Sequence, residues 1–468
     1  MIQITAFAAV FLAALFSKTM SLAGLVLVST VLQATAVFNV PIGNAGGKGI
    51  AAYGVSPYLS MALVAGVAWL VRTGQDRGIH LPKQIRWPFG FFLAYAVVAV
   101  AGGLVLPKWF DGLPVNLLVE MYGIDSLTPL HANLSNIVQA FNLCVHGMVL
   151  LFMLQAAQRA DGLKGLTAGA AGALVSVLCI GFYEQAAQLK GLPSLVPLLA
   201  NNLGYSQAPV AERMIWFRIG LPFTEPSYAS AYLAATSIGL WAIALLGRGW
   251  WWSWVAAAVS TAGLLNSMGA TGVAAAGGAA VVFVLWVVVN ALRARTVLSV
   301  RLRAAAMCAL LLLASTWGYE AYQESSYKPK VDEIAISLIV GKAKLKDGVR
   351  ELSNKRALEI VKETYGLGVG LGSNRASSFF ASLVSNTGVV GALLFSGMLL
   401  SLLWRYFKAP KLTDMQIFVA ASLPTATLAM GLGIPDLNLP MYWGFIFLAF
   451  IFCPELSTAS SKSGSDPN

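Results

Sequence analysis

Arginine side chains and one glutamate stand beside apolar runs in two distant parts of this sequence. The first part holds Arg218 and Glu225, and the second holds Arg356 and Arg375. A guanidinium group matches the geometry of phosphate and diphosphate groups, which makes Arg375 a candidate for binding a substrate phosphate. Glu225, an ionisable residue where an apolar run begins, is a functional candidate by default.

Residues that flank these four are candidates for substrate binding. Pro226, directly after Glu225, suits the first turn of a helix. The stretch "GLGVGLGSNR" (366–375) leaves one backbone face bare of side chains, so it can approach a bulky group closely. It matches neither a dinucleotide fingerprint nor a phosphate-binding P-loop. The binding candidates are Arg213, Arg350, Ser373, Asn374, Tyr228, Gly368 and Gly370.

Each candidate also has a simpler interpretation. Arg375 could reach lipid phosphate, Glu225 could cap a helix, and the glycine run could be a flexible hinge. The histidines His80, His131 and His146 all lie outside the segment 320–376. The spacing therefore supports neither a zinc site nor a Ser-His-Asp triad, and we expect no metal and no cofactor.

The composition identifies the elements that must position these residues. Of the 468 residues, 57% are hydrophobic and only 11% are charged, whereas soluble domains carry about 25% charged residues. Apolar segments close to the ~20 residues that cross a bilayer recur along the chain. We therefore expect an all-α polytopic membrane protein of about 12–14 helices, and no nucleic acid as partner despite the net charge of +11. The expected spans are roughly 2–17, 20–40, 55–72, 88–106, 133–157, 166–185, 228–247, 251–266, 272–292, 304–320, 377–404, 415–433 and 439–454, with 190–200 as a partial piece.

The basic residues of the connections predict the orientation. One set of connections holds sixteen lysines and arginines, and the short connections of the other set hold five. The positive-inside rule places the first set in the cytoplasm. The segments 186–227 and 320–376 then lie outside. Residues 354–365 have the spacing of a short amphipathic helix that lies on the membrane surface or on the bundle.

Four regions follow from this topology. Residues 1–319 hold membrane helices and the outer loop 186–227, and residues 320–376 form a large outer loop. Residues 377–454 return to the membrane, and 455–468 form a disordered cytoplasmic tail.

Two segments resemble a known family. "FRIGLPFTEPSYASAYLA" is similar to the part of the O-antigen polymerase and ligase superfamily in which an arginine precedes Glu-Pro-Ser. "KRALEIVKETYGLGVGLGSNRASSFFASLVSNTGVVGALL" is similar to the end of that family's large periplasmic loop. The resemblance covers about 212–235 and 350–391. It implies a GT-C-like glycosyltransferase in the bacterial inner membrane, with its active site facing the periplasm.

The resemblance also implies the substrates and the roles of the candidates. The enzyme would polymerise glycan repeat units carried on undecaprenyl diphosphate, in contact with membrane lipid, and a chain-length regulator protein is a candidate partner. Arg218, Arg356 and Arg375 would bind the diphosphate, and Glu225 would shape the site or act as the base. Ligases of the family place a histidine after the glycine run, where this chain has Ser373-Asn374-Arg375. This departure favours a polymerase over an O-antigen ligase acting on lipid A core, and it leaves the base unassigned. A lipid-linked glycan flippase or transporter is the alternative from another class.

Overall fold

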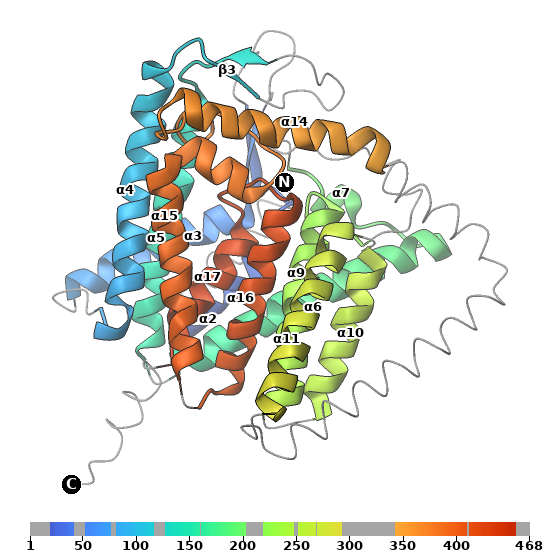
Figure 1. The fold of residues 1–468 in the computed structure, drawn as a ribbon. Helices are drawn as coiled ribbons and strands as arrows, with labels where there is room; N and C mark the ends of the chain where they lie inside the picture. Colours follow the sequence, from blue (N-terminus) through green and yellow to red (C-terminus); the bar gives the residue numbers. More distant parts are fainter. Residues whose placement is uncertain are drawn as a thin grey trace.

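The computed structural model describes residues 19–41, 52–75, 81–116, 127–159, 161–202, 219–247, 251–267, 269–292, 342–409 and 411–454. These residues form a helical bundle (Figure 1). Among them, six helices are long and apolar enough to cross a membrane. They are α4 (Arg86–Trp109), α5 (Leu134–Ala157), α6 (Gly162–Lys190), α9 (Pro226–Leu246), α15 (Phe379–Lys408) and α16 (Asp414–Gly433). The chain is thus an α-helical, multi-pass membrane protein.

Shorter elements complete the described part of the chain. The further helices are α2 (Thr19–Ser29), α3 (Pro57–Gln75), α7 (Val196–Leu199), α10 (Trp251–Ser267), α11 (Ala270–Leu292), α14 (Lys342–Glu363), α17 (Pro440–Ile451) and the 3-10 turn η1 (Lys83–Ile85). The antiparallel hairpins pair β1 (Phe38–Pro41) with β2 (Ala52–Val55), and β3 (Pro114–Val115) with β4 (Thr128–Pro129).

The helices divide into central and peripheral ones. Every residue of α17 is buried, and α9 is nearly as deeply enclosed, which is expected of helices that are apolar all round. On the peripheral helix α4, Trp87 and Trp109 are both more than 70% exposed. At 1.5 Å per residue they are about 33 Å apart, close to the ~30 Å thickness of a bilayer core. The two indoles therefore mark the interfacial belts.

Most expected helices agree with the structure, but the span expected at 20–40 is wrong. Helix α2 ends at Ser29, and irregular backbone leads to β1. The freed backbone groups find partners inside the protein: Ala34 N–H donates to Pro222 O, and Asn202 N–H donates to Ala34 O. Irregular backbone is tolerated at membrane depth when it is buried in this way. The spans expected at 2–17 and 304–320 lie outside the described residues.

Helix α14 lies across one end of the bundle (Figure 1). We call this end of the bundle the α14 end. Helices α4 and α16 end there, and helices α5, α9, α11, α15 and α17 begin there. The helix is longer than the expected 354–365, because it starts at Lys342. Ser353, Ala357 and Ile360 form its buried face, whereas Lys355 and Leu358 are exposed. It is therefore a surface helix, and it covers the ends of the helices that carry the candidate residues.

Candidate functional site

The glycine run 366–372 is packed inside the α14 end. Val369 N–H donates to Ser385 O, Gly370 N–H donates to Asn386 O, and Val389 N–H donates to Gly366 O. These bonds pair the run with α15 where Gly388 interrupts its helical backbone. The glycines at 366, 368, 370 and 372 all have φ between 76° and 93°, a region that glycine enters without steric cost. The run is a structural element held by three bonds, and this excludes a free hinge.

The close approach expected of these glycines occurs against the protein itself. A methyl group built on Gly368 would lie 2.7 Å from Gly388 N, and one on Gly370 would lie 2.7 Å from Gly102 O of α4. This corrects the expectation that Gly368 and Gly370 bind substrate. Their bare faces are covered by α15 and α4, so they have none left for a sugar.

Ser373 and Asn374 are buried in a polar network. The side-chain oxygen of Asn386 accepts from the N–H groups of both residues at 3.1 Å, and its amide donates to Asn374 O. Asn136 of α5 donates to Ser373 Oγ, and Asn374 donates to Ser385 Oγ. Both side chains are satisfied by protein groups and are at most 5% exposed. Their effect is to fix the backbone that carries Arg375.

Arg375 follows this network and is exposed. Its N–H donates to Asn116 O, in the loop after β3. The N–H groups of Ser377 and Ser378 donate to Asn354 Oδ1 of α14. The backbone on both sides of Arg375 is therefore anchored while its guanidinium is presented outward.

Arg356 has a different environment from the expected one. Its Nε and Nη2 donate to Pro114 O at 3.0 and 2.7 Å, and its Nη1 and Nη2 donate to the Glu363 carboxylate at 2.8 Å. Nη1 also donates to Glu359 at 3.2 Å. Hydrogen bonds to Glu363 raise the pKa of Arg356, and the same contacts lower the pKa of Glu363. Arg356 has five N–H donors, and all five are used by protein acceptors. It clamps α14 to β3 and offers no free donor to a diphosphate.

Arg350 lies six residues before Arg356 on α14 and reaches the end of α16. A methyl group built on Gly433 would lie 3.6 Å from Arg350 Nη1 and 3.2 Å from Thr271 Oγ1 of α11. The guanidinium therefore lies beside Gly433 at the end of α16. A weaker candidate in the sequence thus stands over the junction of α11, α14 and α16.

Glu225 precedes α9 in an extended conformation, and Pro226 opens the helix. Its side chain caps no backbone N–H of α9; instead Ser227 Oγ donates to Glu225 Oε2 at 3.0 Å. Glu225 thus occupies the N-cap position of α9 without making a capping hydrogen bond. Tyr228, on the first turn, is buried. Arg213 and Arg218 lie outside the described residues.

Asp436 belongs to this site and was missed in the sequence. It lies in the loop between α16 and α17, where Asn438 N–H donates to its Oδ1 at 3.0 Å. Burial raises the pKa of Asp436; the Asn438 hydrogen bond and the Arg375 charge oppose this, and the Glu225 charge adds to it. The signal was available in "GIPDLNLP", an acid between two prolines at the outer end of a predicted span.

Packing contacts place this loop between the two halves of the site. At its start, Gly433 adjoins Thr271, and the neighbouring Gly272 packs on Ser230 in the first turns of α9. At its end, Asn438 donates to Gln139 O of α5 at 3.0 Å, and Gln139 packs against Gly372. In the sequence, Glu225 shortly precedes Ser230, which takes part in the contact at the start of the loop. Arg375 shortly follows Gly372, which takes part in the contact at its end.

The same end of this loop is also held by residues deeper in the bundle. Asn438 O contacts His146 Nε2 at 3.3 Å, and His146 Nδ1 contacts Tyr58 Oη at 2.6 Å. Trp443 Nε1 donates to Leu437 O and its ring stacks on His146. The Asp436 carboxylate is therefore attached to a rigid loop.

The charges of Arg375 and Glu225 both act on Asp436, and Arg350 lies beside Gly433, at the start of the loop that carries Asp436. Preorganised positive charge at the end of a bundle can bind an anion and stabilise negative charge as it develops. A carboxylate with raised pKa beside it can accept a proton. Within the described residues, no three His, Cys, Asp or Glu side chains gather as a metal site.

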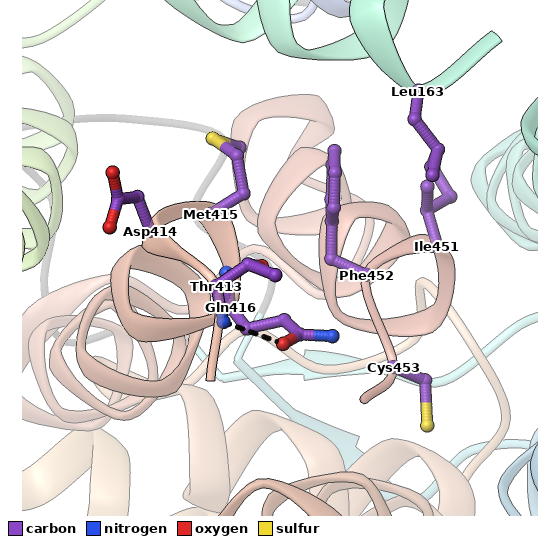
Figure 2. Close-up of a pocket in the computed structure, with 8 residues that line it drawn as sticks. All are labelled: Leu163, Thr413, Asp414, Met415, Gln416, Ile451, Phe452 and Cys453. Carbon is purple, nitrogen blue, oxygen red and sulfur yellow. Dashed lines mark hydrogen bonds between the residues drawn. The ribbon is translucent and has the colours of Figure 1, made fainter. Parts of the chain in front are cut away.

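A pocket of about 300 Å³ lies at the opposite end of the bundle. It is formed by the starts of α6 and α16 and the end of α17 (Figure 2). Thr413 and Gln416 in its wall bond each other as a capping box, and Asp414 is the charged residue of the lining. It contains none of the candidate residues, so it is separate from the site.

Comparison with known proteins adds no assignment. Neither the scan against protein-family models nor the search of curated proteins finds a match to this chain. The class that fold and site define is therefore a multi-pass helical membrane protein with an arginine and carboxylate cluster at one end.

Proposed function

We propose that this protein is a membrane glycosyltransferase that polymerises glycan repeat units carried on undecaprenyl diphosphate. The observation that carries the proposal is the gathering of Arg350, Arg375, Glu225 and Asp436 at one end of a membrane bundle. An enzyme of this kind must hold a diphosphate at the membrane surface and remove a proton from a sugar hydroxyl. Arg350 and Arg375 supply the positive charge that holds a diphosphate, and Glu225 and Asp436 supply carboxylates that can accept the proton.

In this reaction the acceptor hydroxyl attacks the anomeric carbon, and undecaprenyl diphosphate leaves with the bonding electron pair. Arg375 and Arg350 would bind the diphosphate oxygens and stabilise the charge that develops there. Arg218 and Arg213 precede Glu225 in the chain and would add to this group. Arg356 would act indirectly, by fixing the helix that carries Arg350.

The charge distribution supports a periplasmic site. The sixteen basic residues of the cytoplasmic set include Arg405, Lys408 and Lys411, which lie at the end of the bundle opposite α14. By the positive-inside rule, the α14 end would face the periplasm of a bacterial inner membrane. Lipid-linked repeat units assembled on that face could diffuse to the site within the bilayer.

The two alternative functions, a ligase and a transporter, place different demands on the site. A ligase would use the same diphosphate site but lacks here the histidine of its family after the glycine run. A transporter needs ionisable groups near the bilayer midplane, whereas this cluster lies at the helix ends. The transporter is an outcome of the following experiment.

The test uses the full-length protein in lipid nanodiscs and lipid-linked repeat units extracted from a host strain in which the gene is deleted. We expect wild-type protein to produce a ladder of lipid-linked polymers on a gel, and Arg375→Ala to lose it at least tenfold. Lys355→Ala, on the exposed face of α14, is the matched control and should keep the ladder. A ladder that forms equally with folded Arg375→Ala, or no ladder with wild type, would count against the proposal. Net movement of unreacted lipid across vesicles would support the transporter.

A further inference from the structure

Two carboxylates face the site, but their surroundings differ. Glu225 lies at the N-terminus of α9, where the helix dipole and the Ser227 hydroxyl both stabilise its negative charge. Asp436 lies beyond the C-terminus of α16 and receives one backbone N–H on Oδ1. Within the described residues, Oδ2 of Asp436 makes no hydrogen bond. Glu225 thus already accepts a side-chain hydrogen bond, and Asp436 has an oxygen available.

The loop of Asp436 is held by side chains of two neighbouring helices. Asn438 bonds Gln139 on α5, and Leu437 O accepts from Trp443 of α17. A general base must be held within hydrogen-bond reach of the proton that it removes. Fixation by two helices, together with its position between the Glu225 side and the Arg375 side, suits Asp436 for this task.

We propose that Asp436 is the general base that removes the proton of the acceptor hydroxyl, with Glu225 as its charged neighbour. The inference rests on the proposed glycosyl transfer. As the hydroxyl oxygen bonds to the anomeric carbon, its proton passes to Asp436 Oδ2, and the bond from that carbon to the diphosphate oxygen breaks. The electron pair leaves with the diphosphate, whose negative charge the arginines stabilise. Asp436 then returns the proton to water.

Electrostatics supports this division of roles. Burial and the Glu225 charge raise the pKa of Asp436, and Arg375 opposes the rise. A raised pKa makes the carboxylate a stronger base at neutral pH. Within the described part of the chain, Arg350, which adjoins Gly433, and His146, which contacts Asn438 O, are the other charged or titratable groups beside the loop.

The test compares Asp436→Asn with Glu225→Gln in the nanodisc assay, with kcat and KM measured from pH 4 to 9. We expect Asp436→Asn to lower kcat by about 10²-fold or more, with little change in KM, and to remove the acidic limb of the pH profile. Glu225→Gln should keep this limb and move it to lower pH, because the negative charge that raises the pKa of Asp436 is lost. Asp436→Glu should regain part of kcat, which a purely structural role would not produce.

The outcomes separate this inference from the proposed function. If wild type makes polymer and folded Asp436→Asn keeps its kcat and acidic limb, Asp436 is not the base although the function stands. Loss of the limb in Glu225→Gln with its retention in Asp436→Asn would assign the base to Glu225. If wild type makes no polymer, the proposed function itself fails. A melting temperature of Asp436→Asn at or above that of wild type confirms that the variant is folded.

Discussion

Replacing Gly370 by alanine tests the structural account of the glycine run. Gly370 has φ of +93°, and an added methyl group would lie 2.7 Å from Gly102 O, 2.9 Å from Pro107 Cδ and 3.1 Å from Gly103 Cα. All three atoms belong to the backbone or proline ring of α4. They cannot move aside as a flexible side chain would, so the change must displace a helix or the run itself.

Two physical terms give the size of the effect. A non-glycine residue in left-handed backbone costs roughly 1–2 kcal/mol. Overpacking by a methyl group in a close-packed region adds about 1–3 kcal/mol. We therefore expect Gly370→Ala to lower the free energy of unfolding by about 2–5 kcal/mol, from the sum of these ranges.

Gly112→Ala is the matched control because it carries only the first term. Its φ is +83°, but a methyl group there meets nothing within 4 Å. The assay is thermal unfolding of the detergent-purified proteins, followed by tryptophan fluorescence, with size-exclusion profiles before heating. Gly370→Ala should melt well below Gly112→Ala, and Gly112→Ala slightly below wild type. Turnover per folded molecule should stay close to wild type in Gly112→Ala. In Gly370→Ala it should fall only together with the melting temperature, because the displaced run leads to Arg375.

Two results would refute this reasoning. Equal melting temperatures for the two variants would mean that the contact with α4 is absent or soft. A Gly370→Ala protein with wild-type stability but greatly reduced turnover would mean that the bare face meets the substrate, as first expected from the sequence.

Three further predictions concern the charged residues. Arg356→Lys should lower stability by about 1–2 kcal/mol, because an ammonium cannot bridge Pro114 O and a carboxylate as five guanidinium donors do; a loss of kcat without a loss of melting temperature would show that Arg356 touches substrate. Asp436→Asn should melt above wild type at pH 7 to 8, since the raised pKa of Asp436 gives stability in acid that is lost as the pH rises through the folded-state value; equal melting curves at all pH values would contradict this. In a cysteine-free background, Lys355→Cys should react with a membrane-impermeant maleimide in intact spheroplasts and Lys411→Cys only after permeabilisation, and the reverse pattern would invert the orientation.

The sequence was sufficient for the class of protein and for most helix positions. Hydrophobic runs of bilayer length have few alternatives to a membrane helix, because lipid cannot satisfy exposed backbone groups. The run after Glu225 therefore begins a helix at Pro226, and the run before Asp436 ends at Gly433, both close to expectation. The expectation failed at Ser29, where an apolar stretch leaves the helix because distant segments satisfy its backbone.

The composition of the site needed the tertiary structure. Arg356 and Arg375 look equivalent in sequence, yet one is used completely by Pro114, Glu359 and Glu363 while the other is exposed. The sequence around Asp436 indicated only an acid near the end of a span. Its proposed role depends on the charges of Arg375 and Glu225, which come from other segments.

The sequence by itself determined which residues could cross a membrane and which could carry charge at its surface, because both follow from local composition. Only the tertiary structure decided which charges share a site and which glycine faces are already covered. Those properties depend on contacts between segments far apart in the chain, such as Arg350 with Gly433 and Gln139 with Asn438, and no local pattern encodes them.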